Sequence, residues 1–268
     1  MRREITGFSN PLLKEVRGLR EKKLRKRAGL FLAEGLRIMT EARDAGFLPE
    51  MLFRVKDREV HALEIALESA VLAAGGDVIE TSAEIMAKLS GKDNTQAIVG
   101  VYRDHATALE DIDRATAPIW LVAQAMRDPG NLGTMLRTGD AVGAGGLILI
   151  DDCTDPFSVE AVRASMGAIF TQKVVLCRWE VFISWLRKGE GQLVGTSLRT
   201  DIDYQAANYA APCFILTGNE AQGLPAEYED ECDLRVKMPM RGKADSLNAA
   251  IATAVMAYEV LNQFRRNG

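Results

Sequence analysis

The strongest restriction on the fold comes from short, almost wholly apolar segments in the C-terminal half of the chain, such as GLILI and CFILT. A strand with one solvated face alternates apolar and polar residues, whereas a strand covered by helices on both faces does not. Helix-like segments separate these runs, which predicts an α/β domain built on a parallel sheet. We expect strands near residues 118–123, 146–151, 172–177, 192–197, 213–218 and 234–238, and a long last helix over about 246–264.

The first hundred residues predict a second, smaller α/β unit. The segment NPLLKEVRGLREKKLRKRAG is typical of one helix that Asn10 and Pro11 open and Gly29 ends. Further helices are expected in LRIMTEARDAG and EVHALEIALESAVLAAGG, and strands in LFLAEG, MLFRV, DVIET and QAIVGVY. The polar stretch RDHATALEDIDRATA carries no strong strand signal. We therefore predict domains over 1–102 and 118–268, joined by a linker over 103–117.

Composition and residue usage disfavour several classes of protein. The 268 residues are 47% hydrophobic and 26% charged, which is a globular composition. No apolar run approaches the roughly 20 residues that cross a bilayer, and no secretory signal is visible, so we expect a cytoplasmic protein without a membrane partner. The four cysteines form no CxxC pair, and the two histidines, His61 and His105, lie far apart in the sequence. We therefore expect neither a metal site nor a histidine-based catalytic triad.

The charges are unevenly distributed along the chain. The net charge of −4 alone disfavours nucleic acid as a partner. Residues 1–27, however, carry ten lysines and arginines against three glutamates. A basic segment on an acidic body indicates contact with a polyanion, and a merely solvated helix face is the alternative.

Three glycine-containing polar stretches follow predicted strands: DPGNLGTMLRTG, LTGNEAQGLP and MPMRGKADSLNAA. The first lacks the GxGxxG spacing of dinucleotide-binding loops, and the second lacks the lysine of a P-loop. NAD and nucleoside triphosphates are therefore disfavoured as ligands. Since ligands bind at the carboxyl ends of the strands in open α/β sheets, the three loops predict one pocket. Its backbone groups could hold a neutral adenine and ribose, because glycine permits a close approach.

The third stretch also predicts the start of the last helix. Ser246 can cap this helix, and the negative charge of Asp245 interacts favourably with the positive N-terminal end of the helix dipole. One face of the helix is apolar, which is typical of a core or a subunit contact. The residues on that face are Leu247, Ile251, Ala254, Val255, Tyr258 and Leu261. Asn248, in the first turn, is harder to explain by packing and indicates a role in a site.

At these stretches the sequence closely resembles the SpoU (TrmH-type) RNA 2′-O-ribose methyltransferases of the SPOUT class. Three motifs are matched in order. They are Asp128-Pro-Gly-Asn131-Leu-Gly133 with Arg137, then Gly218-Asn-Glu220 with Gly223, then Met238-Pro-Met240 with Gly242 and Ser246-Leu-Asn248. VRASMGAIF is similar to the segment between the first two motifs, and FLAEGLRIMTEA resembles an L30e-like substrate-binding domain. The chain departs from the family at Ala249 and Ala250, where members often carry Val-Ser.

The resemblance implies a fold and a cofactor. The C-terminal SPOUT domain is expected to contain a deep trefoil knot, and the N-terminal domain is expected to be L30e-like. S-adenosylmethionine is the implied methyl donor, and a homodimer is implied in which the partner completes each active site. The implied cofactor-binding residues are Thr217, Gly218, Met238 and Leu247, the last three through backbone groups.

The implied reaction is methylation of a ribose 2′-OH in structured RNA. Ribosomal RNA of the 23S type is favoured, because a separate N-terminal domain is typical of the larger rRNA-type members. The implied catalytic residues are Arg137, Asn131, Glu220, Ser246 and Asn248, and the predicted RNA contacts are Lys22, Lys23, Arg25, Lys26 and Arg27.

Several alternatives stay open at this point. A guanidinium is a poor base, so we expect Arg137 to hold the 3′-phosphate of the target nucleotide and stabilise a developing alkoxide. Family members have also been proposed to use this arginine to activate the hydroxyl. Glu220 could simply pair with an arginine. Transfer RNA as substrate, a non-catalytic RNA-binding assembly factor, and a role in antibiotic resistance are the functional alternatives.

Overall fold

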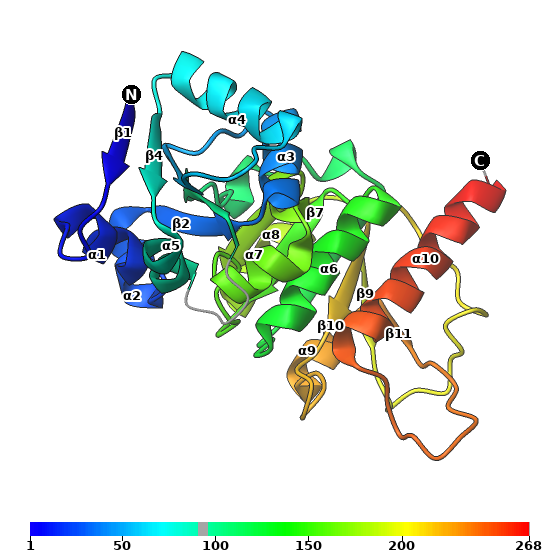
Figure 1. Ribbon diagram of the computed structural model, residues 1–268. Coiled ribbons are helices and arrows are strands. Elements are labelled where there is room, and N and C mark those ends of the chain that lie inside the picture. Colours follow the sequence, from blue (N-terminus) through cyan, green and yellow to red (C-terminus); the bar gives the residue numbers. More distant parts are fainter. Residues whose placement is uncertain (91–95, 268) are drawn as a thin grey trace. The chain divides into compact units, whose positions relative to one another are not determined.

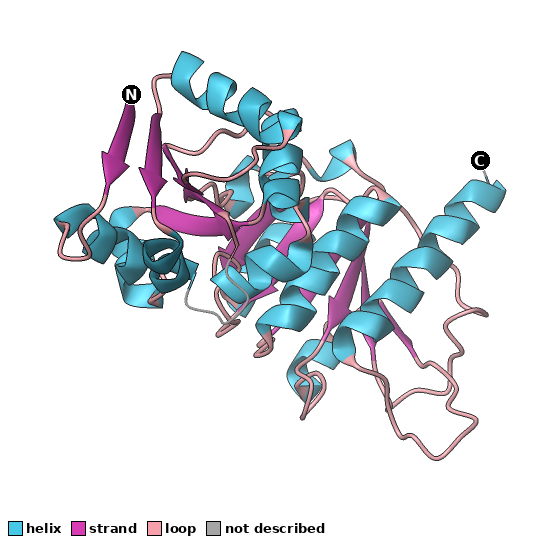
Figure 2. Cartoon of the chain, in the orientation of Figure 1, coloured by secondary structure: helices cyan, strands magenta, loops and turns pink. Residues whose placement is uncertain are grey.

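The computed structural model describes residues 1–90 and 96–267 and divides the chain into two compact units (Figure 1). The first unit contains Met1–His105 together with Phe157–Thr171. The second contains Ala106–Pro156 and the chain from Gln172 to the C-terminal helix. In the second unit, the sheet strands, the helices and a long loop before the last helix can be followed in Figure 2.

The first unit is built on a mixed sheet with the strand order β1-β4-β3-β5-β2 over the described residues. β1, β4 and β3 run parallel, whereas β5 pairs antiparallel with β3 and β2. The strands are β1 (Arg2–Ile5), β2 (Leu30–Glu34), β3 (Met51–Val55), β4 (Asp77–Thr81) and β5 (Ile98–Arg103). The helices are α1 (Pro11–Gly18), α2 (Lys22–Ala28), α3 (Leu36–Asp44), α4 (Ala62–Ala73) and α5 (Ala83–Ser90). The sequence does not predict β1 or α5. It predicts the other elements, but it joins α1 and α2 into a single helix.

The single helix predicted between Asn10 and Gly29 is wrong, because the chain breaks into α1 and α2. Asn10 does cap α1, since its Oδ1 accepts from the backbone of Leu12 at 2.9 Å, and Gly29 ends α2 at φ 64°. The break is stabilised by Arg25, whose Nη1 donates to the carbonyls of Leu19 at 2.9 Å and Arg20 at 2.7 Å. Arg25 is buried, so it belongs to the structure of the turn.

The second unit contains a wholly parallel sheet, which confirms the central prediction from the apolar segments. Its strand order over the described residues is β11-β9-β10-β6-β7-β8. The strands are β6 (Ile119–Gln124), β7 (Gly146–Ile150), β8 (Lys173–Cys177), β9 (Gln192–Thr196), β10 (Cys213–Thr217) and β11 (Leu234–Val236). The helices of this unit are α6 (Pro129–Val142), α8 (Trp179–Arg187), α9 (Ala226–Asp230) and α10 (Ala249–Asn267). The expected trefoil knot stays a prediction.

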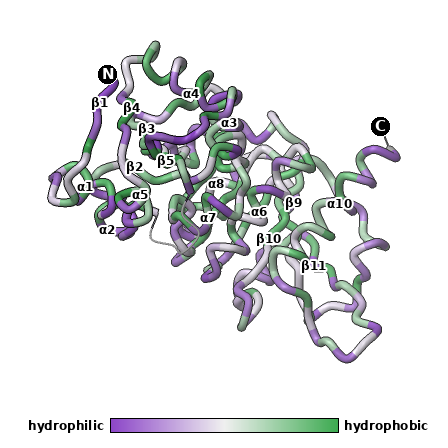
Figure 3. Tube along the Cα trace, viewed as in Figure 1, coloured by the Kyte–Doolittle hydropathy of each residue, from purple (hydrophilic) through white to green (hydrophobic). Residues whose placement is uncertain are grey.

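The core of the second unit explains why its strands are apolar on both faces. Trp120 and Phe214 lie on adjacent strands, are fully buried and stack with ring centroids 6.1 Å apart. Phe182 of α8 packs on the same cluster. On the other side, α10 and α6 pack together, and α10 is hydrophobic along much of its length but ends in a hydrophilic turn (Figure 3).

The segment 157–171 packs within the first unit, although the sequence assigns it to the domain 118–268. It contains α7 (Val159–Ser165), which lies against β2. Arg163 of α7 forms an ion pair with Glu34, whose carboxylate also pairs with Arg20 at 3.2 Å and is almost completely buried. Compactness alone does not show which segments fold by themselves, so the boundaries 1–102, 103–117 and 118–268 stay a prediction.

The role of Arg25 in the turn yields a stability test. Arg25→Ala leaves the carbonyls of Leu19 and Arg20 without their charged donor, and a hydrogen bond to a charged group contributes about 1.5–3 kcal/mol. We expect the free energy of unfolding to fall by about 2 kcal/mol in urea titrations. The matched control is Lys26→Ala, which removes an exposed cation of the same helix and should change it by less than about 0.5 kcal/mol. Equal losses in the two variants would show that Arg25 does not hold the turn.

Candidate active site

A pocket of about 450 Å³ lies at the carboxyl edge of the parallel sheet in the second unit. The loops that follow β9, β10 and β11 line it. They contribute Thr196–Arg199, Thr217–Leu224 and residues between Met238 and Ala249, respectively. The pocket therefore forms where the strand-end argument predicts one, and its size lies within the roughly 300–1,000 Å³ of small-molecule sites.

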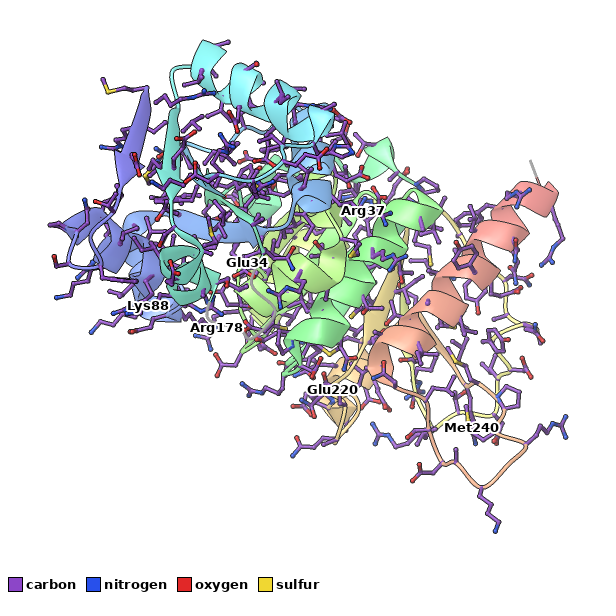
Figure 4. All side chains as sticks on the ribbon, in the orientation of Figure 1. Glu34, Arg37, Lys88, Arg178, Glu220 and Met240 are labelled. Atoms are coloured by element: carbon purple, nitrogen blue, oxygen red, sulfur yellow. The ribbon has the colours of Figure 1, made fainter. Side chains whose placement is uncertain are left out.

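The predicted cofactor-binding residues all line this pocket. Thr217 and Gly218 come from the end of β10, and Met238 and Leu247 come from the loop before α10. Of the predicted catalytic residues, Glu220 and Ser246 line it as well. Figure 4 shows Glu220 near the start of α6 and Met240 on the long loop.

Glu220 connects the first motif to the second. Its Oε1 accepts from Asn131 Nδ2 at 3.1 Å and from the backbone N–H of Asp128 at 3.3 Å. Its Oε2 accepts from the backbone N–H of Arg127 at 3.3 Å. Glu220 forms no ion pair with an arginine in the part of the chain that the structure describes, so the alternative of a simple Glu–Arg pair is not observed there.

Asn131 in turn connects the first motif to the third. Asn248 Nδ2 donates to Asn131 Oδ1 at 2.9 Å. Asn131 thus accepts from one loop with its oxygen and donates to Glu220 of another with its nitrogen. Three segments that are far apart in the sequence are held by this chain of two side-chain hydrogen bonds.

The electrostatics of Glu220 favour its charged form. Partial burial raises the pKa of this carboxyl, but the hydrogen bonds from Asn131 and from backbone amides outweigh that effect, so the pKa lies below its ordinary value. Glu220 is therefore a carboxylate at neutral pH. As an acceptor of several N–H groups it is suited to holding loops rather than to donating a proton.

Asparagine and aspartate side chains begin the two helices that border the site. Asp128 caps α6, because its Oδ1 accepts from the backbone N–H of Asn131 at 2.7 Å. Asn248 caps α10, because its Oδ1 accepts from Ala250 at 3.0 Å and Ile251 at 3.2 Å. The prediction that Ser246 caps this helix is wrong.

The reason for that error is where the helix begins. α10 starts at Ala249, so Ser246 lies in the loop and its hydroxyl contacts the carboxylate of Asp245 at 3.2 Å. Asn248 has two tasks that use different atoms. Its oxygen caps α10, and its nitrogen holds Asn131.

The loop after β10 requires glycine at its start. A Cβ on Gly218 would lie 2.3 Å from the backbone of Gly223, so no side chain fits there. Asn219 and Gly223 exchange backbone hydrogen bonds at 3.1 and 2.9 Å, and Asn219 Nδ2 donates to the carbonyl of Ala125 at 2.8 Å. The wall of the pocket at Gly218 is therefore bare backbone, which permits a ligand to approach closely.

Thr217, which precedes Gly218, also lines the pocket. Its hydroxyl is buried and lies 2.8 Å from that of Thr253 on α10. Because the Thr253 hydroxyl donates to the carbonyl of Ala249 at 2.8 Å, Thr217 is the donor of the pair. Thr217 thus joins β10 to α10 directly below the pocket.

Part of the lining was missed in the sequence. Ser197 and Arg199 follow β9, and both bind Glu229, a buried carboxylate of α9. Ser197 Oγ donates to Glu229 at 2.9 Å and Arg199 Nε donates to it at 2.7 Å. The available signal was the polar stretch TSLRT at the end of a predicted strand, to which the same strand-end argument applies.

Arg137 lies outside this pocket. It is exposed on α6, and no hydrogen bond or ion pair involves it in the described ranges. It lies six positions after Asn131, which corresponds to about 9 Å along the helix and about 120° around it. The side chains of Asn131 and Arg137 therefore project from different faces of α6, and Arg137 lies away from the hydrogen bonds around Glu220.

The predicted RNA contacts of α2 divide into two kinds. Lys22, Lys23, Lys26 and Arg27 are exposed, whereas Arg25 is buried in the turn. Among the described residues, no group of histidine, cysteine or acidic side chains could hold a metal ion. Nor does any helix of the described ranges have the length and apolar character to span a membrane.

A family model described as the SpoU rRNA methylase family matches residues 118–258. The chain belongs to this family. A second model, described as an MRM3-like substrate binding domain, matches residues 10–100. Both matches agree with the resemblance seen in the three motifs and in the N-terminal segment.

Relatives of known name match over nearly the whole chain. A 23S rRNA (guanosine(2553)-2′-O)-methyltransferase of Bacillus subtilis is 29% identical over 96% of this chain and 99% of its own length. A 23S rRNA (uridine(2479)-2′-O)-methyltransferase of Streptomyces viridochromogenes is 31% identical over 89% of this chain and 85% of its own. An rRNA methyltransferase from Sinorhizobium meliloti, solved with AdoMet bound, is 36% identical, covers 98% of each chain and superposes with a TM-score of 0.91.

The two tasks of Asn248 yield a paired prediction. Asn248→Ala removes the cap of α10, and we expect it to lower the free energy of unfolding by about 1 kcal/mol. Ser246→Ala removes a hydroxyl that caps nothing and should change it by less than about 0.5 kcal/mol. Thermal and urea denaturation of the two variants decide between the residues. A larger loss in Ser246→Ala would restore the prediction made from the sequence.

Proposed function

We propose that this protein transfers a methyl group from S-adenosylmethionine to a ribose 2′-OH of RNA, with 23S-type ribosomal RNA as substrate. The observation that carries the proposal is the pocket lined by residues of the second and third motifs. The hydrogen bonds of Asn131 with Glu220 and Asn248 connect the first motif to it. The named relatives and the AdoMet-bound neighbour support it. Ribosomal RNA as substrate also favours the cytoplasm as location.

The residues of the pocket fit the adenosyl and methionyl parts of this cofactor. Gly218, Met238 and Leu247 line it. We assign their backbone groups to hydrogen bonds with the uncharged base and ribose. Gly218 keeps the backbone bare, and Thr217 is held below it. When bound there, S-adenosylmethionine supplies an electrophilic methyl group on a sulfonium.

The chain's own residues then have to hold the ribose and manage the charge on its oxygen. We assign Arg137 to the 3′-phosphate of the target nucleotide and to the developing alkoxide, because a guanidinium is a strong hydrogen-bond donor and a poor base. Asn131, Glu220 and Asn248 orient the loops around the reacting groups. We assign Ser246, which lines the pocket, to contact with the ligand.

We further propose that Arg137 acts in the active site of a partner subunit. Support comes from its position, since it does not line the pocket of its own chain. Support also comes from α10, where Ile251 and Tyr258 lie on one helical face and are 53% and 48% exposed. Their apolar face is therefore not fully used by the core of one chain, which fits the alternative of a subunit contact.

A non-catalytic assembly factor is the rival for the same fold. The network of Asn131, Glu220 and Asn248 argues against it, because a protein without a cofactor would not need the three loops held in register around a pocket. The exposed cations Lys22, Lys23, Lys26 and Arg27 suit either function. Transfer to rRNA from radiolabelled S-adenosylmethionine separates the two.

Mixed dimers test both the activity and the location of Arg137. Arg137→Ala and Gly218→Val should each abolish methyl transfer as homodimers, the first by loss of the cation and the second by a clash with the backbone of Gly223 in the pocket wall. In a heterodimer of the two variants, isolated through two different affinity tags, one site combines an intact pocket with an intact Arg137 of the partner. We therefore expect the heterodimer to regain activity on rRNA.

The control is a heterodimer of Arg137→Ala with wild type, which should be active as well. A heterodimer of Arg137→Ala and Gly218→Val that stays inactive would place Arg137 in its own chain's site. Arg137→Ala homodimers with normal turnover and normal RNA binding would remove Arg137 from the reaction altogether.

A further inference from the structure

The turn between β1 and α1 presents an aromatic side chain to solvent. Phe8 is 52% exposed. The turn around it is well defined, since the backbone N–H of Asn10 donates to the carbonyl of Gly7 at 3.2 Å and the Asn10 side chain caps α1. These contacts use backbone and Asn10 atoms, so the fold does not require an aromatic residue at position 8.

Phe8 forms the rim of a pocket of about 130 Å³ between α1 and α5. The floor is apolar, because Leu13, Ile85 and Leu89 belong to the buried core of the first unit. The rest of the lining is polar or charged and comes from Ser9, Lys14, Arg17 and Lys88. Figure 4 labels Lys88, which belongs to α5.

The charges around this pocket have one sign. Lys14, Arg17 and Lys88 are exposed, and among the residues that the structure describes no carboxylate lines the pocket. Within residues 1–90 and 96–267, none of the three forms an ion pair. The ammonium of Lys88 instead lies over the Phe8 ring, 3.9 Å from its centroid. A half-exposed aromatic ring and three uncompensated cations thus surround an apolar hollow.

We propose that this pocket binds an unpaired nucleotide of the RNA substrate, an inference that rests on the proposed function. Unstacked bases bind proteins by stacking on aromatic side chains, while lysine and arginine contact the flanking phosphates. The base stacks on Phe8 above the apolar floor. Lys88 leaves the ring and joins Lys14 and Arg17 at the phosphates.

The proposal also divides the work of the first unit. The exposed cations of α2 attract any RNA backbone, paired or unpaired, and carry no preference for structure. The Phe8 pocket adds a preference for unpaired nucleotides, because a base inside a duplex cannot present its face to a ring. A loop or bulge of a folded RNA is therefore the expected ligand of this surface.

Photochemical crosslinking tests the proposal on the full-length protein. The probes are an oligouridylate that contains 4-thiouridine and the same strand annealed to oligoadenylate. We expect the single strand to crosslink to the peptide that contains Phe8, as mapped by mass spectrometry. Crosslinks found elsewhere, with none at this peptide, would overturn the proposal.

Affinity measurements by fluorescence anisotropy give the second readout. Phe8→Leu keeps an apolar side chain but removes the ring, and we expect it to weaken single-strand binding roughly tenfold and duplex binding little. Phe8→Trp should preserve binding. Lys188→Ala, which removes an exposed lysine of the second unit, is the matched control and should leave both affinities unchanged. Equal affinities of wild type and Phe8→Leu for the single strand, or equal losses for both probes, would contradict stacking at Phe8.

A parallel methyl-transfer assay on rRNA separates this inference from the proposed function. We expect Phe8→Leu to raise KM for RNA and leave kcat near that of the wild type. If the wild type methylates rRNA and Phe8→Leu leaves RNA affinity unchanged, the pocket proposal fails and the enzyme stands. If the single strand binds through Phe8 but no RNA receives a methyl group, the pocket stands and the proposed reaction fails.

Discussion

The carboxylate of Glu220 lines the pocket and accepts hydrogen bonds from the Asn131 side chain and from the backbone amides of Arg127 and Asp128, so these contacts tie the loop after β6 to the pocket lining. A carboxylate can accept several N–H groups at once, and its lowered pKa keeps it charged at neutral pH. Asn131 extends the contact to Asn248. The loop after β6, the loop after β10 and the start of α10 are thereby held in one arrangement.

This network works because the parallel sheet has already brought the loops together. β6 and β10 are neighbours, so their carboxyl ends place the first and second motifs side by side. Asp128 and Asn248 then serve as helix caps, which aligns α6 and α10 with the same edge. The side chains that hold the candidate site together are thus also those that begin its helices.

Much of this arrangement could be predicted from the sequence, and the errors have physical causes. Uninterrupted apolar runs are specific to strands buried on both faces, so the parallel sheet was found strand by strand. The break between α1 and α2 was not predicted, because it depends on hydrogen bonds from the Arg25 side chain to two backbone carbonyls, which no local sequence pattern reveals. For the same reason, a buried structural arginine was counted among the predicted RNA contacts.

The remaining differences arise from three-dimensional context. Ser246 and Asn248 are both good caps, and only the point at which the loop joins α10 decides between them. The contact of Arg163 with Glu34 joins residues 129 positions apart, so the path of segment 157–171 could not be read from periodicity. Arg199 and Glu229 likewise meet only after β9 and α9 are in place.

Isothermal titration of S-adenosylmethionine into the purified protein tests most directly whether the network around Glu220 shapes a cofactor site. We expect saturable binding to the wild type and a loss of affinity of roughly tenfold or more in Glu220→Ala, because Asn131 and two backbone amides lose their acceptor. Gly218→Val should abolish the binding. An absence of heat with the wild type, or equal affinity in Glu220→Ala, would contradict the proposed site.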